Sequence, residues 1–203
     1  MENYKTDDKV YRFEDIDLSG TYSYADYLRW EFDERLELIK GKIFTMSPGP
    51  ATLHQRILLK LSYQLYHFLQ KRSCEVFIAP FDVRLPQNSL DDNWVYTVVQ
   101  PDLCVICDKS KIDGKGCIGA PDIVVEILSP GNSKKELKNK FEVYEEAGVK
   151  EYWIIHPEER TFFKYVLNAS GRFEPTHLLT LGDHVTSSVL PGFELSLDEV
   201  FAD

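Results

Sequence analysis

The clearest pattern along the chain is an apolar stripe at helical spacing, which follows the helix-breaking segment Ser47-Pro48-Gly49-Pro50. Its members are Leu53, Ile57, Leu58, Leu61, Leu65 and Phe68. The stripe predicts a helix over residues 51–72 with one face against a core. A second helix is expected over residues 134–147, because Gly148 suits the position just after a helix end. A short helix is expected over residues 23–32.

Strand patterns fill most of the remaining chain. Segments 35–39 and 42–46 alternate around Lys40-Gly41, which predicts a β-hairpin. Residues 121–130, Pro-Asp-Ile-Val-Val-Glu-Ile-Leu-Ser-Pro, form a nearly continuous apolar run, typical of a strand covered on both faces. Further strands are expected over residues 74–85, 95–108 and 151–155, with short strands and turns from 161 onward.

The order of these elements indicates the fold class. Helices and strands alternate in the middle of the chain, which predicts an α/β fold with a mixed β-sheet flanked by helices. A length of 203 residues suits one domain, and we expect a single domain over residues 1–203. Within it, residues 1–20 are expected to be a loosely ordered lead-in, and about 160–203 a β-rich C-terminal extension.

Composition favours an intracellular protein. Hydrophobic residues make up 43% and charged residues 28% of the chain, as in water-soluble globular proteins. No apolar run approaches the roughly 18–20 residues that span a bilayer, so no membrane segment is expected. The N-terminal stretch is acidic and lacks the apolar region of a signal peptide, so we expect a cytoplasmic location.

The cysteines give a further expectation. Cys74, Cys104, Cys107 and Cys117 do not have the density of a disulfide framework, so reduced, packed thiols are expected. The Cys104-x-x-Cys107 spacing, with Cys117 as a third ligand, is also compatible with a zinc site. However, residues three apart on a strand point to opposite faces, which argues against zinc.

Charge alone does not decide the partner. A formal net charge of −10 argues against non-specific coating of nucleic acid, which needs a basic surface, although a local positive groove would suffice for a nuclease. Lysine-rich stretches could line such a groove or be ordinary solvated charges. They comprise Lys109, Lys111 and Lys115, and then Lys134, Lys135, Lys138 and Lys140.

Glu126 is the first candidate for chemistry. It is the single charge inside Val124-Val125-Glu126-Ile127-Leu128. An uncompensated buried charge costs several kcal/mol, so this carboxylate should be protonated, paired or bound to a metal. The alternatives are exposure at the sheet edge or a structural ion pair with a lysine.

A second carboxylate belongs to the preceding strand. Asp102 follows Pro101 at the start of that strand. Two carboxylates on adjacent strands suit a hard cation such as Mg²⁺, which prefers oxygen ligands and keeps several waters. A Pro-Asp turn is the alternative for Asp102, and it is favoured for Asp122.

Lys140 is the most informative residue of the second helix. On a helical wheel it falls beside Tyr144, on the side that Leu137 and Phe141 define as inward. A lysine on an apolar face either extends its amine to water or meets a buried carboxylate. In the second case its ammonium would lie beside Glu126 and Asp102, where it could orient a water.

Two further residues are accessory candidates. His54 lies within the apolar stripe of the long helix, in its first turn, where a hydrogen-bonded core histidine is an equally good interpretation. Glu37 in the hairpin either points into the site or is an exposed carboxylate. The sequence has neither a Gly-rich phosphate loop nor a G-x-S-x-G nucleophile motif.

These residues resemble a known motif. Asp102 after Pro101, followed by Glu126 on the next strand, is similar to the PD-(D/E)XK motif of restriction-endonuclease-like nucleases. More specifically, the chain resembles the Uma-type endonuclease family of bacterial proteins. The resemblance covers about residues 36–157 and a C-terminal stretch. The matching segments are LELIKGKIFTMSPGPATLH, PDLCVI, PDIVVEILSP, KFEVY, AGVKEYWIIHP and LPGFELSLDEVF.

The resemblance implies a restriction-endonuclease-like core and a function. It implies hydrolysis of phosphodiester bonds in DNA, with Mg²⁺ or Mn²⁺ held by Asp102, Glu126 and the backbone carbonyl of Ile127. One position departs from the motif, because Leu128 stands where its lysine is expected. The resemblance implies that Lys140 supplies this ammonium, with His54 and Glu37 as accessory groups.

Two other interpretations stay open. The chain could be a catalytically silent nucleic-acid-binding or regulatory module that retains the nuclease fold, as Leu128 and the acidic net charge suggest. It could also be a structural protein that forms a homodimer through the edges of its C-terminal strands. Metal binding that depends on the carboxylates would distinguish the nuclease from the silent module.

Overall fold

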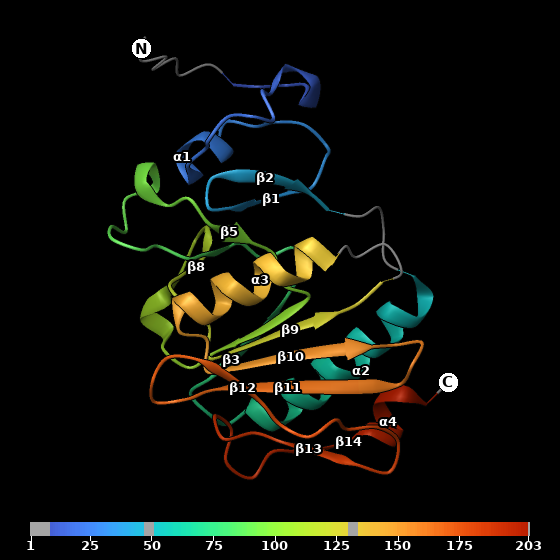
Figure 1. Ribbon diagram of the computed structural model, residues 1–203. Coiled ribbons are helices and arrows are strands. Elements are labelled where there is room, and N and C mark those ends of the chain that lie inside the picture. The colour runs from blue at the N-terminus through green and yellow to red at the C-terminus, as the bar shows by residue number, and fades with distance from the viewer. Residues whose placement is uncertain (1–8, 47–50, 130–133, 203) are drawn as a thin grey trace.

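The computed structural model describes residues 9–46, 51–129 and 134–202, and residues 134–136 by their backbone alone. A six-stranded central sheet dominates the lower half of the molecule in Figure 1. Its one parallel pair is β9·β10, and all its other neighbours are antiparallel, so the predicted mixed sheet is confirmed. In spatial order the strands are β12 (Phe173–Pro175), β11 (Thr161–Leu167), β10 (Glu151–His156), β9 (Ile123–Ile127), β6 (Leu103–Ile106) and β3 (Glu75–Ile78).

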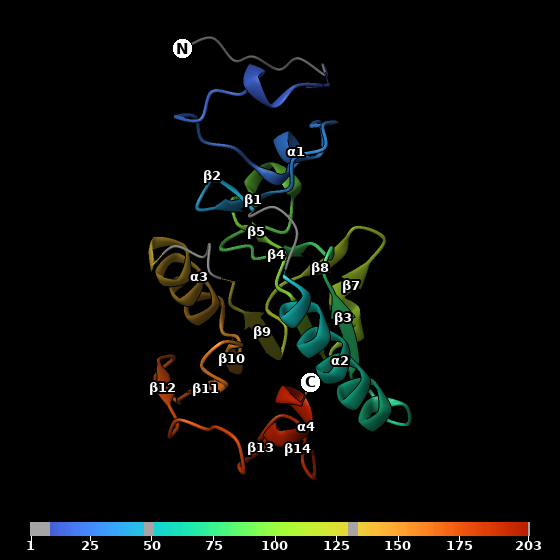
Figure 2. The same ribbon diagram turned by 90° about the vertical axis from the view of Figure 1, so that its right-hand side faces the viewer.

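Helices cover both faces of the central sheet. The long helix α2 (Thr52–Leu69) packs on one face and α3 (Lys134–Ala147) on the other, as Figures 1 and 2 show. Every residue of β9 is buried, which confirms the strand covered on both sides. Because side chains alternate along a strand, Val125 joins the core beneath α2, whereas Val124 joins the core beneath α3. Glu126, two residues beyond Val124, therefore faces α3.

A second mixed sheet of six strands forms where the sequence predicted only one sheet, and the edge of it made by the predicted hairpin lies above α3 in Figure 1. The predicted β-hairpin forms its edge, with Lys40 at φ 52° and Gly41 at φ 77° in the turn. The α1 helix (Tyr24–Tyr27) packs beside it, shorter than the helix predicted over 23–32. In spatial order the strands are β2 (Lys42–Thr45), β1 (Leu36–Ile39), β5 (Val98–Val99), β4 (Val83–Arg84), β8 (Gly116–Ile118) and β7 (Ile112–Asp113).

The second sheet arises because two predicted strands are each divided. The segment 74–85 forms β3 in the central sheet and β4 in the second sheet, with Pro80 between them. The segment 95–108 likewise forms β5 and β6, with Pro101 between them. A proline has no N–H for the ladder, so it suits the point where a chain leaves a sheet. Because the chain passes from the second sheet to the central sheet at Pro101, Asp102 lies directly before β6.

The C-terminal region is β-rich, as expected, but part of it belongs to the central sheet. The strands β11 and β12 extend that sheet beyond β10. A separate two-stranded sheet, β13 (His184–Thr186) with β14 (Glu194–Ser196), precedes the short helix α4 (Leu197–Phe201). Three 3-10 turns complete the described elements: η1 (Phe13–Asp15), η2 (Asp92–Trp94) and η3 (Lys109–Lys111). Across the described ranges, no helix has the length and apolar character needed to cross a membrane.

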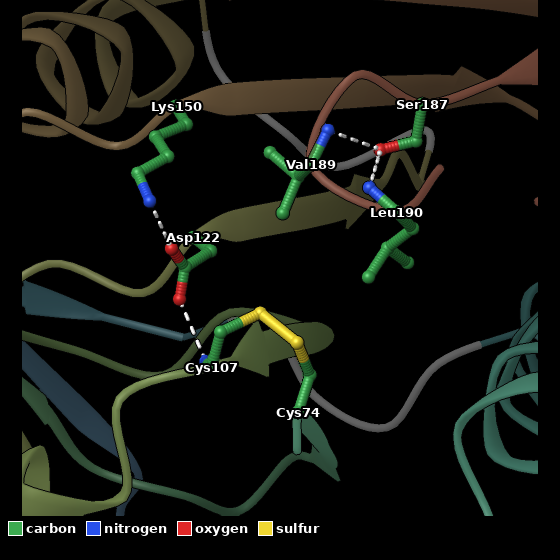
Figure 3. Close-up of a disulfide and its surroundings, with 7 residues drawn as sticks. All are labelled: Cys74, Cys107, Asp122, Lys150, Ser187, Val189 and Leu190. Carbon is green, nitrogen blue, oxygen red and sulfur yellow. Dashed lines mark hydrogen bonds and ion pairs between the residues drawn. A yellow bond between two sulfur atoms is a disulfide. The ribbon is translucent and has the colours of Figure 1, made fainter. Parts of the chain in front are cut away.

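The expectation that all cysteines are reduced is wrong for one pair. Cys74 and Cys107 form a disulfide (Figure 3). The antiparallel register pairs Glu75 with Ile106, so the cysteines just beyond them lie opposite each other. Because the two cysteines are 33 residues apart in the sequence, no local sequence pattern indicates that they pair.

The remaining cysteines, Cys104 and Cys117, are buried thiols in the core beneath α3. Cys107 packs against the core on the opposite side of the sheet. The two residues of the Cys104-x-x-Cys107 pair therefore point to opposite faces, as the strand argument predicted, and they do not form a zinc site.

Candidate functional site

The candidate site lies between the central sheet and α3, with Glu126 at its centre. The carboxylate of Glu126 leaves β9 toward α3 and is 7% exposed. Its Oε1 atom accepts a hydrogen bond of 3.0 Å from the ammonium of Lys140 and one of 2.8 Å from the hydroxyl of Tyr144. Both donors come from α3 and lie four residues apart, so they share one face of the helix. The buried acid is thus paired rather than exposed at the sheet edge.

Lys140 is buried, as its place on the helical wheel predicted, and does not extend to water. Its side chain is 4% exposed, and its Nζ atom lies 3.0 Å from Oε1 of Glu37 as well as 3.0 Å from Oε1 of Glu126. Glu37 comes from β1 of the second sheet, and its side chain is 2% exposed. One ammonium therefore joins a carboxylate from each of the two large sheets.

The charge balance of this cluster shifts two protonation equilibria. Burial raises the pKa of Glu126 to about 8; the Lys140 ammonium opposes this shift, and the carboxylates of Asp102 and Glu37 add to it. Burial by itself would lower the pKa of Lys140, but the attraction of Glu126 and Glu37 outweighs it, so this pKa is raised well above the ordinary value. The ammonium therefore stays charged, while Glu126 can take up a proton near neutral pH.

Asp102 and His54 lie at the end of this cluster, where α2 begins. Oδ2 of Asp102 accepts a hydrogen bond of 2.7 Å from the backbone N–H of Ile127, so the carboxylate is held against the residue that follows Glu126. Nε2 of His54 lies 3.2 Å from Oδ1 of Asp102, and the imidazole is buried. Nδ1 of His54 has no hydrogen-bond partner in the described part of the chain. All five candidate residues of the sequence therefore meet in one region.

Two contributors to the site were not singled out from the sequence. Tyr144 was expected only to lie on the inward face of α3, yet its hydroxyl donates a hydrogen bond to Glu126. The backbone N–H of Gln100 donates a bond of 2.8 Å to Oε1 of Glu37, which fixes that carboxylate beside β5. Tyr144 could have been found from its helical spacing to Lys140, but the Gln100 contact depends on the second sheet, which no pattern revealed.

Asp122 lies outside the site and has a structural role. Its Oδ2 atom accepts from the backbone N–H of Cys107 at 2.7 Å, and Oδ1 pairs with Lys150 at 2.6 Å (Figure 3). The favoured interpretation of Asp122 as a structural turn residue is consistent with these contacts.

The described lysines of the two lysine-rich stretches, apart from Lys140, make contacts away from the site or face solvent. Lys109 pairs with Glu75, Lys115 pairs with Asp92, and Lys111 donates to the carbonyl of Ala120. Lys138 is 75% exposed on the outer side of α3, in keeping with a solvated charge. The side chains of Lys134 and Lys135 lie outside the described residues. Among the lysines of these stretches whose side chains the structure describes, only Lys140 reaches the carboxylates.

The donor chemistry fits a partly hydrated hard cation. Asp102 and Glu126 offer carboxylate oxygens on neighbouring strands, and Lys140 and Tyr144 both contact Oε1 of Glu126 rather than Oε2. Among the described residues, no group of three or more His, Cys, Asp or Glu side chains is arranged to hold a metal. A closed cage for zinc or calcium is therefore not built there, whereas Mg²⁺ commonly takes one or two carboxylates and keeps its other waters.

A family model and one curated protein match much of the chain. The family model of Uma2, described as "Putative restriction endonuclease", matches residues 24–198, which include the whole candidate site. An uncharacterized protein of Synechocystis is 29% identical over 121 residues, and this match covers 59% of the present chain and 60% of that protein.

A solved structure shares the fold. The crystal structure of a protein from Anabaena variabilis, described as a "putative nuclease", superposes with a TM-score of 0.69. The match covers 89% of the present chain and 97% of the Anabaena chain at 22% identity. At this identity the likeness establishes the fold alone.

Proposed function

We propose, from the premise that this chain belongs to the Uma2 family, that it is a metal-dependent endonuclease that hydrolyses phosphodiester bonds in DNA. The observation that carries the proposal is the cluster of the buried Glu126 and Lys140 with the partly buried Asp102, where ionisable groups are held together at a cost to stability. Such costs are usual where a protein needs perturbed protonation or metal binding. Ion-pair networks also perturb pKa values, so the proposal requires a test of activity.

Each residue of this cluster would have a distinct role in metal binding or catalysis. Asp102 and Glu126, with the backbone carbonyl of Ile127, would hold Mg²⁺ or Mn²⁺. When bound, such an ion supplies Lewis acidity that polarises a phosphate and makes a water more acidic. The backbone N–H of Ile127 already fixes the carboxylate of Asp102, and His54 on its other oxygen would position it further.

Lys140 would replace the lysine that the motif places at position 128, where this chain has Leu128. Its ammonium would orient the attacking water and balance the negative charge that builds up on the phosphate. Glu37 and Tyr144 would act as positioning residues, because Glu37 holds the amine of Lys140 and Tyr144 holds Oε1 of Glu126.

A second candidate function is a silent module that binds nucleic acid without cleaving it. Two observations favour it: Leu128 stands in the motif, and Lys140 is already engaged by two carboxylates at 3.0 Å each. In that case the cluster would serve only to connect the two sheets.

Cleavage of supercoiled plasmid DNA separates the two functions. The nuclease proposal expects nicked and linear plasmid with Mg²⁺ or Mn²⁺ and intact plasmid in EDTA. Glu126→Gln protein, purified identically, serves as the blank for contaminating nucleases. Single-stranded DNA and RNA of the same sequence, assayed in parallel, identify the substrate. No cleavage of any of these substrates, together with no metal binding that depends on Asp102 and Glu126, would favour the silent module.

The affinity for metal should depend on pH. The raised pKa of Glu126, about 8, means that below this pH a bound cation must displace the proton. We therefore expect the apparent affinity for Mn²⁺ to rise by up to about tenfold for each pH unit toward 8 and then to level off. Calorimetric titration in buffers of different ionisation enthalpy measures both the affinity and the released proton. An affinity for Mn²⁺ that stays constant as the pH rises toward 8 would contradict the assignment of Glu126 as a ligand.

A further inference from the structure

The helix α2 lies in a segment whose charge is opposite to that of the whole protein. Residues 38–74 contain six Lys or Arg side chains and no Asp or Glu, although the chain has a formal net charge of −10. Four of the six lie on α2 or directly after it: Arg56, Lys60, Lys71 and Arg72. A basic segment in an acidic chain indicates that an anionic partner binds locally.

The exposed side of α2 also carries aromatic and apolar side chains. Leu59, Tyr63 and Tyr66 are 71%, 61% and 60% exposed, and with Arg56 they form one stripe at helical spacing. The ring of Tyr63 stacks on His67 with centroids 6.0 Å apart. The core-facing side of the helix is filled by other residues, so these side chains are not needed for packing. Arg, Lys and Tyr side chains are donors that contact phosphates in nucleic-acid complexes, so this surface suits a nucleic acid.

Two of the four charges are available to a partner. Arg56 and Lys71 are exposed, and within residues 9–46, 51–129 and 137–202 neither has an ion-pair or hydrogen-bond partner. By contrast, Lys60 donates to the carbonyl of Ala202, and the guanidinium of Arg72 lies over the ring of Phe68. The free charges thus lie near the two ends of the stripe.

The helix that carries the stripe starts beside the candidate site. His54, in the first turn of α2, contacts Asp102, and from there the helix runs along the front of the molecule in Figure 2. An 18-residue helix is about 27 Å long. That is the length of about eight base pairs of duplex DNA.

We propose that the exposed stripe of α2 binds the phosphate backbone of the nucleic acid on one side of the cleavage point. This inference rests on the proposed function, because it assumes that the site receives a nucleic acid. The surface consists of the stripe Arg56, Leu59, Tyr63 and Tyr66, together with Lys71 directly after the helix. A second copy of the chain is the other occupant to consider, but a symmetric contact would place this basic face against itself. Charge complementarity therefore favours the polyanion.

Fluorescence anisotropy in EDTA tests the stripe without cleavage. The probe is a labelled DNA duplex of about 24 base pairs, three times the span of α2. For Arg56→Glu/Lys71→Glu, we expect at least about a tenfold loss of affinity and a slope of log K against log salt that is shallower by about two. The matched control Lys9→Glu/Arg12→Glu has the same change in net charge at exposed sites away from α2, and should bind within about threefold of wild type.

Replacement of the two exposed tyrosines gives a second readout that does not change the charge of the protein. Tyr63→Ala/Tyr66→Ala removes two hydroxyls that would donate to phosphate oxygens but removes no charge, so it should bind at least about fivefold more weakly with an unchanged salt slope. The proposal is overturned if the stripe variants bind like the wild type, if the charge control loses as much affinity, or if the wild type does not bind the duplex. A dimer that Tyr63→Asp dissociates without loss of DNA binding would assign the stripe to a second copy. Since every measurement is made in EDTA, these outcomes are independent of plasmid cleavage, which judges the proposed function.

Discussion

Replacement of Lys140 by Met is expected to reduce DNA cleavage by about 10²–10³-fold, because the ammonium that balances charge on the phosphate is lost. The same change should lower the free energy of unfolding by about 3–5 kcal/mol, since it leaves the buried Glu37 carboxylate without its cation and removes a hydrogen-bond donor from Glu126. Plasmid cleavage and urea denaturation followed by circular dichroism measure the two effects.

Two variants separate catalysis from stability at this position. Lys138→Met removes an exposed amine two residues earlier on the same helix, and should change neither activity nor stability appreciably. Lys140→Met/Glu37→Gln removes one carboxylate charge together with the amine, so it should regain much of the lost stability while it stays inactive. If the double variant regains cleavage along with stability, Lys140 has only a structural role.

The Glu126→Gln variant should lose activity but keep its stability. We expect cleavage to fall by at least about 10³-fold, because several kcal/mol of transition-state stabilisation depend on the ion that this carboxylate would hold. Stability should stay within about 1 kcal/mol of the wild type near pH 7, because the pKa of about 8 means that the folded protein already holds Glu126 mainly in its neutral form. A neutral amide resembles that form. Loss of function without loss of stability is the signature of a residue kept for chemistry.

A suitable control is Glu75→Gln on β3, a carboxylate that is 45% exposed and pairs with Lys109 at the surface. It should leave cleavage unchanged, since surface ion pairs contribute little. A Glu126→Gln protein that cuts DNA as fast as the wild type would refute the role of Glu126. A large loss of stability in that variant would show instead that Glu126 is mainly structural.

The sequence revealed the parts of the site that rest on local periodicity. A charge inside a continuous apolar strand identified Glu126, and helical spacing placed Lys140 on the inward side of α3, where the structure has it. Both signals come from the high cost of burying a charged group. The catalytic roles of these residues remain predictions, because the geometry by itself does not measure activity.

The second sheet was not predictable because its strands are short and lie far apart in the sequence. The strands β4 and β5 have two residues each, too few for an alternation pattern to appear. In addition, β4 follows Pro80 and β5 precedes Pro101, and the sequence pattern predicted that each proline lay inside one longer strand. For the same reason the contact between Gln100 and Glu37, and the disulfide between Cys74 and Cys107, depend on strand register rather than on any motif.

The most direct test of the pocket is to locate a bound ion. Crystals of the wild-type protein soaked in Mn²⁺ should show one anomalous peak that lies about 2.1 Å from a carboxylate oxygen of Asp102 and from one of Glu126, with Lys140 beside it. The peak should be absent in Glu126→Gln crystals treated identically. A fully soaked wild-type crystal with no peak between these two carboxylates, or with an equal peak in the variant, would contradict the metal-dependent nuclease.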